Sequence, residues 1–255
     1  MADLVVAVIP ARYGSERLPG KPLLPLAGKP ILAHTISAAK ACRAIDKVLV
    51  ATDHNDIFAI AEKWGAEAVM TSSDLPSGSD RIGAALQDRP GDIVVNLQGD
   101  EPETEPQHLQ RCIEGLREDK GASVSTLCTP LGRGELMDPD CVKVVCDQKD
   151  RAIYFSRAPL GVDREDLRRA LNNQSGSYQS AASRHLGVYA YRRSALETFL
   201  SRPPTPLESL ERLEQLRLLE HGMIIAVRSV QAAVRGIDTE TDLARVRARL
   251  MGKSK

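Results

Sequence analysis

Residues 4–32 read "LVVAVIPARYGSERLPGKPLLPLAGKPIL", an apolar run followed by a basic loop that contains two glycines before Lys21. The run is apolar on both faces and predicts a buried strand. Arg12, Arg17 and Lys21, with glycines that permit close backbone approach, favour binding of a phosphate chain. A solvated loop with three surface cations is the alternative. The loop is not a Walker A motif, because Lys21 precedes Pro22 instead of Ser or Thr, and the G-x-G-x-x-G pattern of dinucleotide sites is absent.

The first half of the chain alternates short apolar runs with longer amphipathic segments. We expect strands at 4–9, 47–52 and 92–97 and helices at 30–42, 55–64, 79–88 and 106–119. Strands that alternate with helices form a parallel sheet covered on both faces. The sequence therefore predicts an α/β fold with a doubly wound, mostly parallel sheet, in which ligands bind at the carboxyl ends of the strands.

The second half is more mixed. Strands are expected at 141–147, 152–157 and 186–192, and one amphipathic helix at 206–222. The polar stretch 171–183 is typical of a mobile loop or lid. No linker rich in Pro, Gly or Ser divides the chain. We therefore expect a single domain, residues 1–255, with a smaller lobe at about 130–220 inserted into the sheet.

Composition narrows the possible partners. Lys and Arg total 34, and so do Asp and Glu, so no global positive field is present to hold a nucleic-acid polymer or an anionic membrane. The first nine residues lack the basic flank and length of a signal peptide, and no apolar run reaches the roughly 18 residues of a membrane span. A cytoplasmic location is expected. The five cysteines form no C-x-x-C pair and are interpreted as small buried hydrophobes.

Several short motifs follow the opening loop in a fixed order. They are "ATD" (51–53), "SGSDRI" (77–82), "NLQGDEP" (96–102), "YFSRAPL" (154–160), "RHLGVYAYR" (184–192), "PLESLERLEQLR" (206–217) and "GIDTETDL" (236–243). Together with the loop, this series resembles the 3-deoxy-manno-octulosonate cytidylyltransferase family, the CMP-Kdo synthetases of lipopolysaccharide assembly, over about residues 5–250. The resemblance implies a fold of the nucleotide-diphospho-sugar transferase type. It also implies transfer of CMP from CTP to Kdo, with release of pyrophosphate, by a magnesium-dependent homodimer.

The resemblance assigns roles at the nucleotide. The catalytic residues would be Arg12, Arg17, Lys21 and Asp100; the magnesium ligands Asp100 and Asp238; and the nucleotide-binding residues Ala11, Arg12, Lys21, Asp53, Gly78, Ser79 and Arg81. These assignments make chemical sense, because attack on a triphosphate depends mostly on positioning and on neutralising charge. Taken alone, Asp100 fits a turn or a helix cap equally well, and Asp238 fits ordinary capping.

The resemblance also assigns the sugar site. Kdo carries a carboxylate and many hydroxyls, so its site needs cations and hydrogen-bonding side chains. These would be Gln98, Arg157, His185, Tyr189, Glu214 and Gln215. Without the family pattern, Glu214 and Gln215 are a solvated pair, because the leucines from 207 to 216 recur every third residue and drift around the helix axis. His185 alone would be a surface or core histidine.

Some positions depart from the family pattern. Gly161 and Val162 stand where the family commonly has proline and an aromatic residue, which predicts a more flexible wall of the sugar site. Glu16 places an acid where small neutral residues are usual. The alternatives in function are a cytidylyltransferase for another sugar acid, such as amino-substituted Kdo or sialic acid, a non-catalytic nucleotide-binding regulator, and a sugar-binding module.

Overall fold

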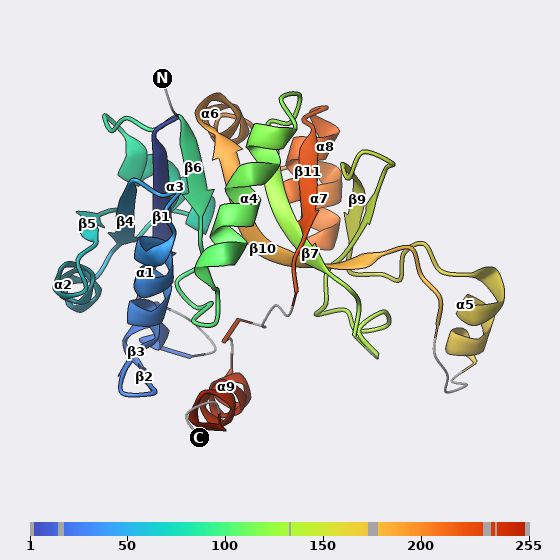
Figure 1. Cartoon of the computed structure of the whole chain (residues 1–255), viewed down its shortest axis with the longest axis horizontal. Helices are drawn as coiled ribbons and strands as arrows, with labels where there is room; N and C mark the ends of the chain where they lie inside the picture. The colour runs from blue at the N-terminus through green and yellow to red at the C-terminus, as the bar shows by residue number, and fades with distance from the viewer. Residues whose placement is uncertain are drawn as a thin grey trace.

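The fold is a mostly parallel sheet with helices on both faces, as the sequence predicts (Figure 1). The computed structural model describes residues 3–14, 18–132, 134–172, 178–231, 236–237 and 239–252. Seven strands form the main path of the sheet in the order β11-β7-β10-β6-β1-β4-β5. Their bounds are β1 (Val5–Ala11), β4 (Lys47–Thr52), β5 (Glu67–Met70), β6 (Ile93–Asn96), β7 (Val124–Thr129), β10 (Ser183–Arg192) and β11 (Ile225–Ser229).

Strand direction divides the sheet into two parts. β1 runs parallel to β4 and β6, and β4 runs parallel to β5. On the other side, β11 runs parallel to β7. β10 lies between β6 and β7 and is antiparallel to both. The carboxyl ends of β1, β4 and β6 therefore share one edge of the sheet, where the basic loop begins.

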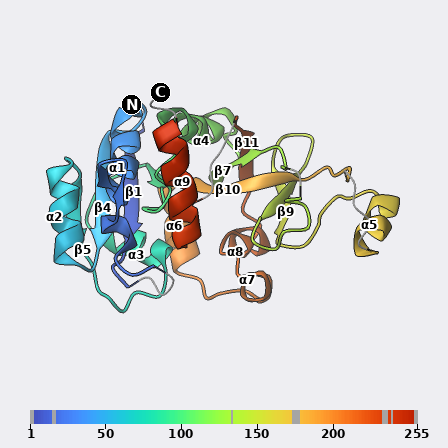
Figure 2. The same cartoon turned by 90° about the horizontal axis from the view of Figure 1, so that it is seen from below.

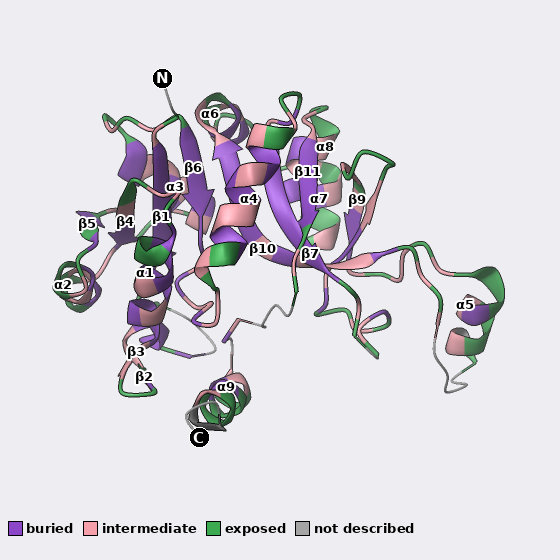
Figure 3. Cartoon of the chain, in the orientation of Figure 1, coloured by how far each residue is buried: buried purple, intermediate pink, exposed green. Residues whose placement is uncertain are grey.

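Alternate side chains of β1 face two separate cores. Val5, Ala7 and Ile9 pack with α1, α2 and α4, whereas Val6 and Val8 pack with α3 and α6. β1, β6 and β7 are buried at every position (Figure 3). The helix bounds are α1 (Ile31–Ala41), α2 (Asn55–Lys63), α3 (Gly78–Leu86), α4 (Pro106–Glu118) and α6 (Arg193–Leu200). The continuous apolar runs of the sequence thus reflect burial on both faces of the sheet.

The segment predicted as an inserted lobe contributes both to the sheet and to an extension beyond it. β8 (Lys143–Cys146) pairs with β9 (Ala152–Ser156) and with one end of β10. α5 (Arg164–Leu171) projects away from the sheet beyond this hairpin (Figures 1 and 2). Much of the predicted lid at 171–183 lies outside the described residues. The smaller lobe stays a prediction as a separate unit, because β10 belongs to the central sheet.

The predicted continuous helix at 206–222 is wrong. The chain forms two short helices, α7 (Pro206–Glu211) and α8 (Gln215–Glu220), separated by Arg212 in a left-handed conformation with φ 54° and ψ 49°. Leucines at every third residue cannot all face one side of a straight helix, and Leu210 is 80% exposed while Leu213 and Leu216 are buried. The break places the residues that follow it, Leu213 to Gln215, in the lining of a cleft beside β10.

Gly161 and Val162 form backbone contacts and line neither of the two clefts described below, and the flexibility expected of this segment stays a prediction. Gly161 has φ 56°, and its carbonyl accepts a hydrogen bond from Ala181 N at 2.9 Å. Val162 forms an antiparallel bridge with Ser180. Glu16 lies outside the described residues. Four of the cysteines are buried and Cys146 is partly buried, as expected, and all five are free. Among the described residues, no helix has the length and apolar character needed to cross a membrane.

Candidate active site

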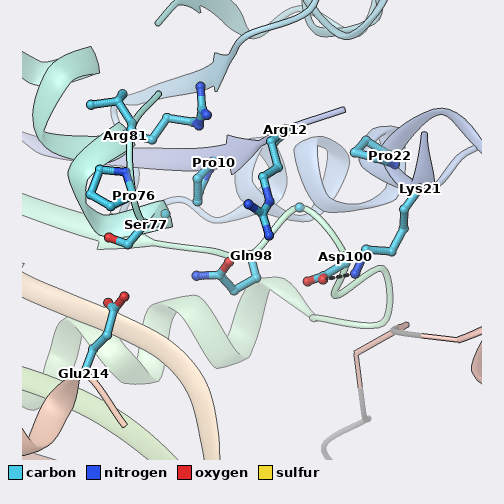
Figure 4. Close-up of a pocket in the computed structure, with 14 residues that line it drawn as sticks. Pro10, Arg12, Lys21, Pro22, Pro76, Ser77, Arg81, Gln98, Asp100 and Glu214 are labelled. Carbon is cyan, nitrogen blue, oxygen red and sulfur yellow. Dashed lines mark hydrogen bonds and ion pairs between the residues drawn. The ribbon is translucent and has the colours of Figure 1, made fainter. Parts of the chain in front are cut away.

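Two adjoining clefts lie beside the carboxyl ends of β1 and β6. The first has a volume of about 470 Å³ and is lined by Pro10, Ala11, Arg12, Lys21, Pro22, Leu75, Pro76, Ser77, Gly78, Arg81, Gln98, Gly99, Asp100 and Glu214 (Figure 4). The second has a volume of about 980 Å³ and lies toward β10 and the α7–α8 turn. Arg12, Gln98 and Glu214 line both clefts. A molecule in one cleft therefore shares a wall with a molecule in the other.

The basic loop is held at its start by side chains outside the first cleft. Tyr13 N donates to Asp53 Oδ1 at 3.2 Å, and the Tyr13 ring stacks on His54 with centroids 4.1 Å apart. Gly20 N donates to Tyr13 O at 3.1 Å, and Gly20 has φ 66°. A Cβ at Gly20 would lie 3.4 Å from the Tyr13 ring. These contacts fix the backbone on both sides of the loop, so that Arg12 and Lys21 face the first cleft.

Lys21 and Asp100 form an ion pair in the first cleft. Lys21 Nζ lies 2.5 Å from Asp100 Oδ2, and their side chains are 10% and 30% exposed (Figure 4). Arg12 is exposed in the same cleft, and its guanidinium has no hydrogen bond or ion pair with any residue that the structure describes. Arg81 and Glu214 also line this cleft, so it presents three cations and two carboxylates, and Asp100 is paired with Lys21.

Two predicted residues of this cleft cannot be placed. Arg17 and Asp238 lie outside the described residues. The residue before Asp238 is described: Ile237 N donates to Asp100 O at 2.9 Å, so the 236–237 segment lies against Asp100 although more than a hundred positions separate them in the chain. Within the described part of the chain, no group of three or more His, Cys, Asp or Glu side chains is placed to hold a metal ion.

Small residues let the start of α3 approach β1 closely. A Cβ on Gly78 would lie 3.5 Å from Pro10 Cγ, and one on Gly99 would lie 3.2 Å from Pro10 O. Ser77 caps α3, because its Oγ accepts from Asp80 N at 3.1 Å. Ser77, Gly78 and Gly99 all line the first cleft, so its wall beside β1 consists of small residues.

Three residues predicted to bind nucleotide, Asp53, Ser79 and Arg81, also contact other side chains of the protein. Arg81 is 3% exposed and forms an ion pair with Asp53 at 3.1 Å. Arg81 Nη1 also donates to Thr71 Oγ1 at 2.5 Å, although Arg81 still lines part of the first cleft. Ser79 Oγ donates to Glu214 Oε2 at 2.6 Å. This bond ties α3 to the start of α8, which brings Glu214 to the boundary between the clefts.

A bulge in β10 shapes the second cleft. The pairing of β10 with β7 shifts between Leu186 and Tyr189. Thr126 Oγ1, 2.9 Å from His185 Nε2, also donates to the carbonyl of Val188. Both His185 and Tyr189 line this cleft, as predicted for sugar-binding residues. Burial among these neighbours lowers the pKa of His185 to about 3, so its imidazole is neutral at neutral pH and acts through hydrogen bonds.

The remaining predicted sugar-site residues line the same cleft from several elements. Gln98, Arg157, Glu214 and Gln215 all line the second cleft. Gln98 Nε2 donates to Asn96 Oδ1 at 3.0 Å. Burial of the Tyr189 side chain raises its pKa well above the usual range, so its hydroxyl stays protonated. The structure therefore assembles all six predicted sugar-site residues around one cleft.

Sequence reasoning missed several residues that line the clefts. Pro10, Ser77, Asn96, Arg184 and Arg212 lie within or beside the motifs of the family pattern but were assigned no role. Their position inside those motifs was the available signal. Arg184 pairs with Glu135 at 3.1 Å, a contact across 49 positions that no local pattern predicts.

Comparison with known proteins fits this arrangement. A family model described as cytidylyltransferase matches residues 6–225. A 3-deoxy-manno-octulosonate cytidylyltransferase of Bdellovibrio bacteriovorus is 43% identical over 95% of this chain and 96% of its own. One from Escherichia coli is 40% identical over 95% of this chain and 94% of its own. A solved structure of CMP:2-keto-3-deoxy-manno-octonic acid synthetase complexed with CTP has a TM-score of 0.88 and 39% identity, covering 99% of this chain and 100% of that one.

The fold and the two clefts are thus those of a cytidylyltransferase. Within that class, the chain belongs to the 3-deoxy-manno-octulosonate cytidylyltransferase family.

Proposed function

We propose that this protein transfers CMP from CTP to 3-deoxy-D-manno-octulosonate (Kdo) and releases pyrophosphate. The observation that carries the proposal is the shared wall of the two clefts. Arg12, Gln98 and Glu214 line both, so a nucleotide in the first cleft and a sugar acid in the second would meet there. Family membership over nearly the whole chain supports the same reaction.

The reaction joins an oxygen of the sugar to phosphorus. The anomeric hydroxyl of Kdo attacks the α-phosphorus, a new oxygen–phosphorus bond forms, and the bond to the pyrophosphate oxygen breaks while the hydroxyl proton leaves. Arg12 and Lys21, with Arg17 assigned by the resemblance, stabilise the charge that builds on the phosphate oxygens. Water exclusion and orientation in the adjoining clefts bring the two reactants together.

The start of α3 and the end of β1 are proposed to bind the base. Ala11 and Gly78 are small residues that line the first cleft, which suits a backbone clamp that reads the amine and carbonyl of cytosine. Ser79 and the Asp53–Arg81 pair are proposed to support that clamp from behind, because their own side chains bind protein partners.

Magnesium is proposed as the cofactor. Asp100 offers the hard oxygen that Mg²⁺ prefers, in a cleft that would also receive phosphate oxygens, and Mg²⁺ commonly uses one or two carboxylates plus substrate phosphates. The donor chemistry therefore fits, with Asp100 and Asp238 as the residues that would hold the ion. When bound, the metal would neutralise phosphate charge and orient the triphosphate.

A cytoplasmic homodimer is also proposed, serving lipopolysaccharide assembly as in the resembling family. Three of the exposed large hydrophobic residues, Met137, Ile153 and Leu210, lie between 130 and 220. Ile153, on β9, is 60% exposed and suits a two-fold interface at the β8–β9 hairpin.

The test is pyrophosphate release with CTP and a panel of 2-keto sugar acids. Kdo should support turnover better than amino-substituted Kdo or sialic acid. Pyrophosphate release that is independent of Kdo, or fastest with another acid, would contradict the proposal.

A further inference from the structure

Arg212 has a backbone conformation that non-glycine residues rarely adopt. It ends α7 with φ 54° and ψ 49°. Such an outlier persists only where surrounding contacts hold it, and outliers of this kind concentrate at functional sites. Leu213 follows it with a buried side chain, and Leu213 N donates to Glu208 O at 3.3 Å. The turn places Arg212 in the lining of the second cleft, next to Leu213, Glu214 and Gln215.

Arg157, the arginine predicted to bind the sugar acid, is largely committed to the protein. Its Nε donates to Glu211 O at 3.0 Å, the carbonyl of the peptide group that joins Glu211 to Arg212. Its Nη1 donates to Pro139 O at 3.0 Å, and its backbone N donates to the Glu211 carboxylate at 3.0 Å. Its own carbonyl accepts a hydrogen bond from the fully buried Lys143. Arg157 therefore supports the turn that carries Arg212.

Arg212 is not committed in this way. Its side chain is exposed, and within the described ranges it has no hydrogen bond or ion pair. Several other charged groups of this cleft have partners: Arg184 pairs with Glu135, and Glu103 pairs with Arg249. Arg12, at the wall shared with the first cleft, is unpaired among the described residues but is the arginine assigned to the phosphates. The carboxylates of Asp140 and Glu214 line the same cleft, and Glu214 accepts from Ser79. Arg212 thus presents to the cleft a guanidinium that is unpaired in the described part of the chain, whereas Arg157 uses two of its five guanidinium donors to hold the protein backbone.

We propose that Arg212 binds the carboxylate of the acceptor in the second cleft and is a further residue that makes this site specific for a sugar acid. The inference rests on the proposed function and deepens it. A guanidinium matches a carboxylate with two parallel hydrogen bonds, which a neutral sugar cannot provide. Arg157 acts as the positioning residue for the turn.

The test uses Arg212→Met, which removes the charge and keeps much of the volume. Loss of a hydrogen bond to a charged group should raise KM for Kdo about tenfold to a hundredfold. KM for CTP, kcat and the melting temperature should stay unchanged. Arg212→Lys should recover part of the loss, because it restores the charge without the fork. Arg212→Asn separates backbone from charge, since Asn tolerates the left-handed conformation, and it should match the Met variant. Arg202→Met is the matched control, because Arg202 lines neither cleft.

A second acceptor, the carboxamide of Kdo, tests whether Arg212 binds the carboxylate, because the amide removes its charge. The wild-type protein should lose affinity for the carboxamide by about the same factor as Arg212→Met loses for Kdo, and the variant should treat the two acceptors alike. Asp140→Asn should leave KM for Kdo unchanged or lower it, because it removes a competing carboxylate. The inference is overturned if KM for Kdo in the Arg212→Met variant equals that of the wild-type protein. It is also overturned if the substitution weakens binding of Kdo and of the carboxamide by the same factor. The proposed function stands in both cases. Failure of the wild-type protein to release pyrophosphate with Kdo overturns both.

Discussion

Replacing Asp100 with Asn tests the chemistry of the first cleft. The change keeps the size of the side chain and removes a charged oxygen that faces Arg12 and Lys21. If this carboxylate holds the proposed metal, the lost stabilisation of the transition state is several kcal/mol. Turnover should then fall by at least about a hundredfold, which corresponds to about 2.7 kcal/mol.

The ion pair with Lys21 sets the effect on stability. If Asp100 faced only another carboxylate, Asp100→Asn would leave the stability of the protein unchanged or raise it. Asp100 Oδ2 instead lies 2.5 Å from Lys21 Nζ, so the substitution removes an attraction. Two unit charges about 4 Å apart at an effective dielectric constant of about 20 attract by about 4 kcal/mol, and desolvation offsets much of this. With both side chains mostly covered, we expect a net loss of about 1–2 kcal/mol. The melting temperature of a chain of this size should fall by about 2–8 °C.

The assay is Kdo-dependent pyrophosphate release across a magnesium titration, with thermal melts of the protein without nucleotide. Lys21→Met and the double variant complete a double-mutant cycle that isolates the energy of the ion pair. Each single variant should be less stable than wild type, and the double variant should lose less stability than the sum of the two single losses. Asp3→Asn, an exposed aspartate outside both clefts, is the control for loss of one charge. A folded Asp100→Asn protein with near-normal turnover at sub-millimolar magnesium would refute the reasoning. An unchanged melting temperature would refute the contribution of the ion pair.

Three further outcomes are expected. CTP should be strongly preferred in turnover assays, with UTP weaker and purine triphosphates nearly inactive, because fixed groups near Ala11 and Gly78 read the base; comparable turnover with ATP would contradict this. Light scattering at micromolar concentration should give a dimer, and Ile153→Asp should shift it toward monomer; a monomeric wild-type protein would count against the interface. The pKa of His185 lies near 3 in the folded protein and about 6.5 when unfolded, so acid protonates the unfolded state first. Stability should fall by up to about 1.4 kcal/mol per pH unit as pH drops from about 6.5 toward 3, and His185→Gln should lose this part of the slope in denaturant titrations; identical slopes would exclude it.

Local patterns predicted β1, β4 and β6 because these strands are continuous apolar runs. They did not predict β7, whose sequence VSTLCT mixes polar and apolar residues yet is buried at every position. Its hydroxyls bind within the fold, as Thr126 does with His185 and two carbonyls. Burial of such a strand depends on partners elsewhere in the chain, which periodicity does not contain.

The candidate site shows the same limit. The family pattern identified residues that do line the clefts, including Arg12, Lys21 and Asp100. It could not show that Arg81 and Asp53 bind each other, or that Ser79 reaches Glu214 across 135 positions. The break at Arg212 was missed for a related reason: the contacts that hold it come from Arg157 and other residues distant in sequence. Motifs predict which residues gather at a site, whereas long-range contacts determine which of those residues bind other side chains of the protein.

The central position of β10 has a consequence for synthesis of the protein on the ribosome. β6 and β7 are not neighbours in the sheet, and each pairs with β10, which is made only when residues 183–192 emerge. Until then β1, β4, β5 and β6 form one fragment with an open edge at β6, and β7 lacks both of its partners, because β11 is made later still; such open edges can pair with another chain. β10 closes the edge of β6 and joins β7 to the sheet, and β11 then closes the other edge of β7. Chains that stall or are truncated before residue 183 should therefore aggregate or be degraded, even though they contain most of the first cleft.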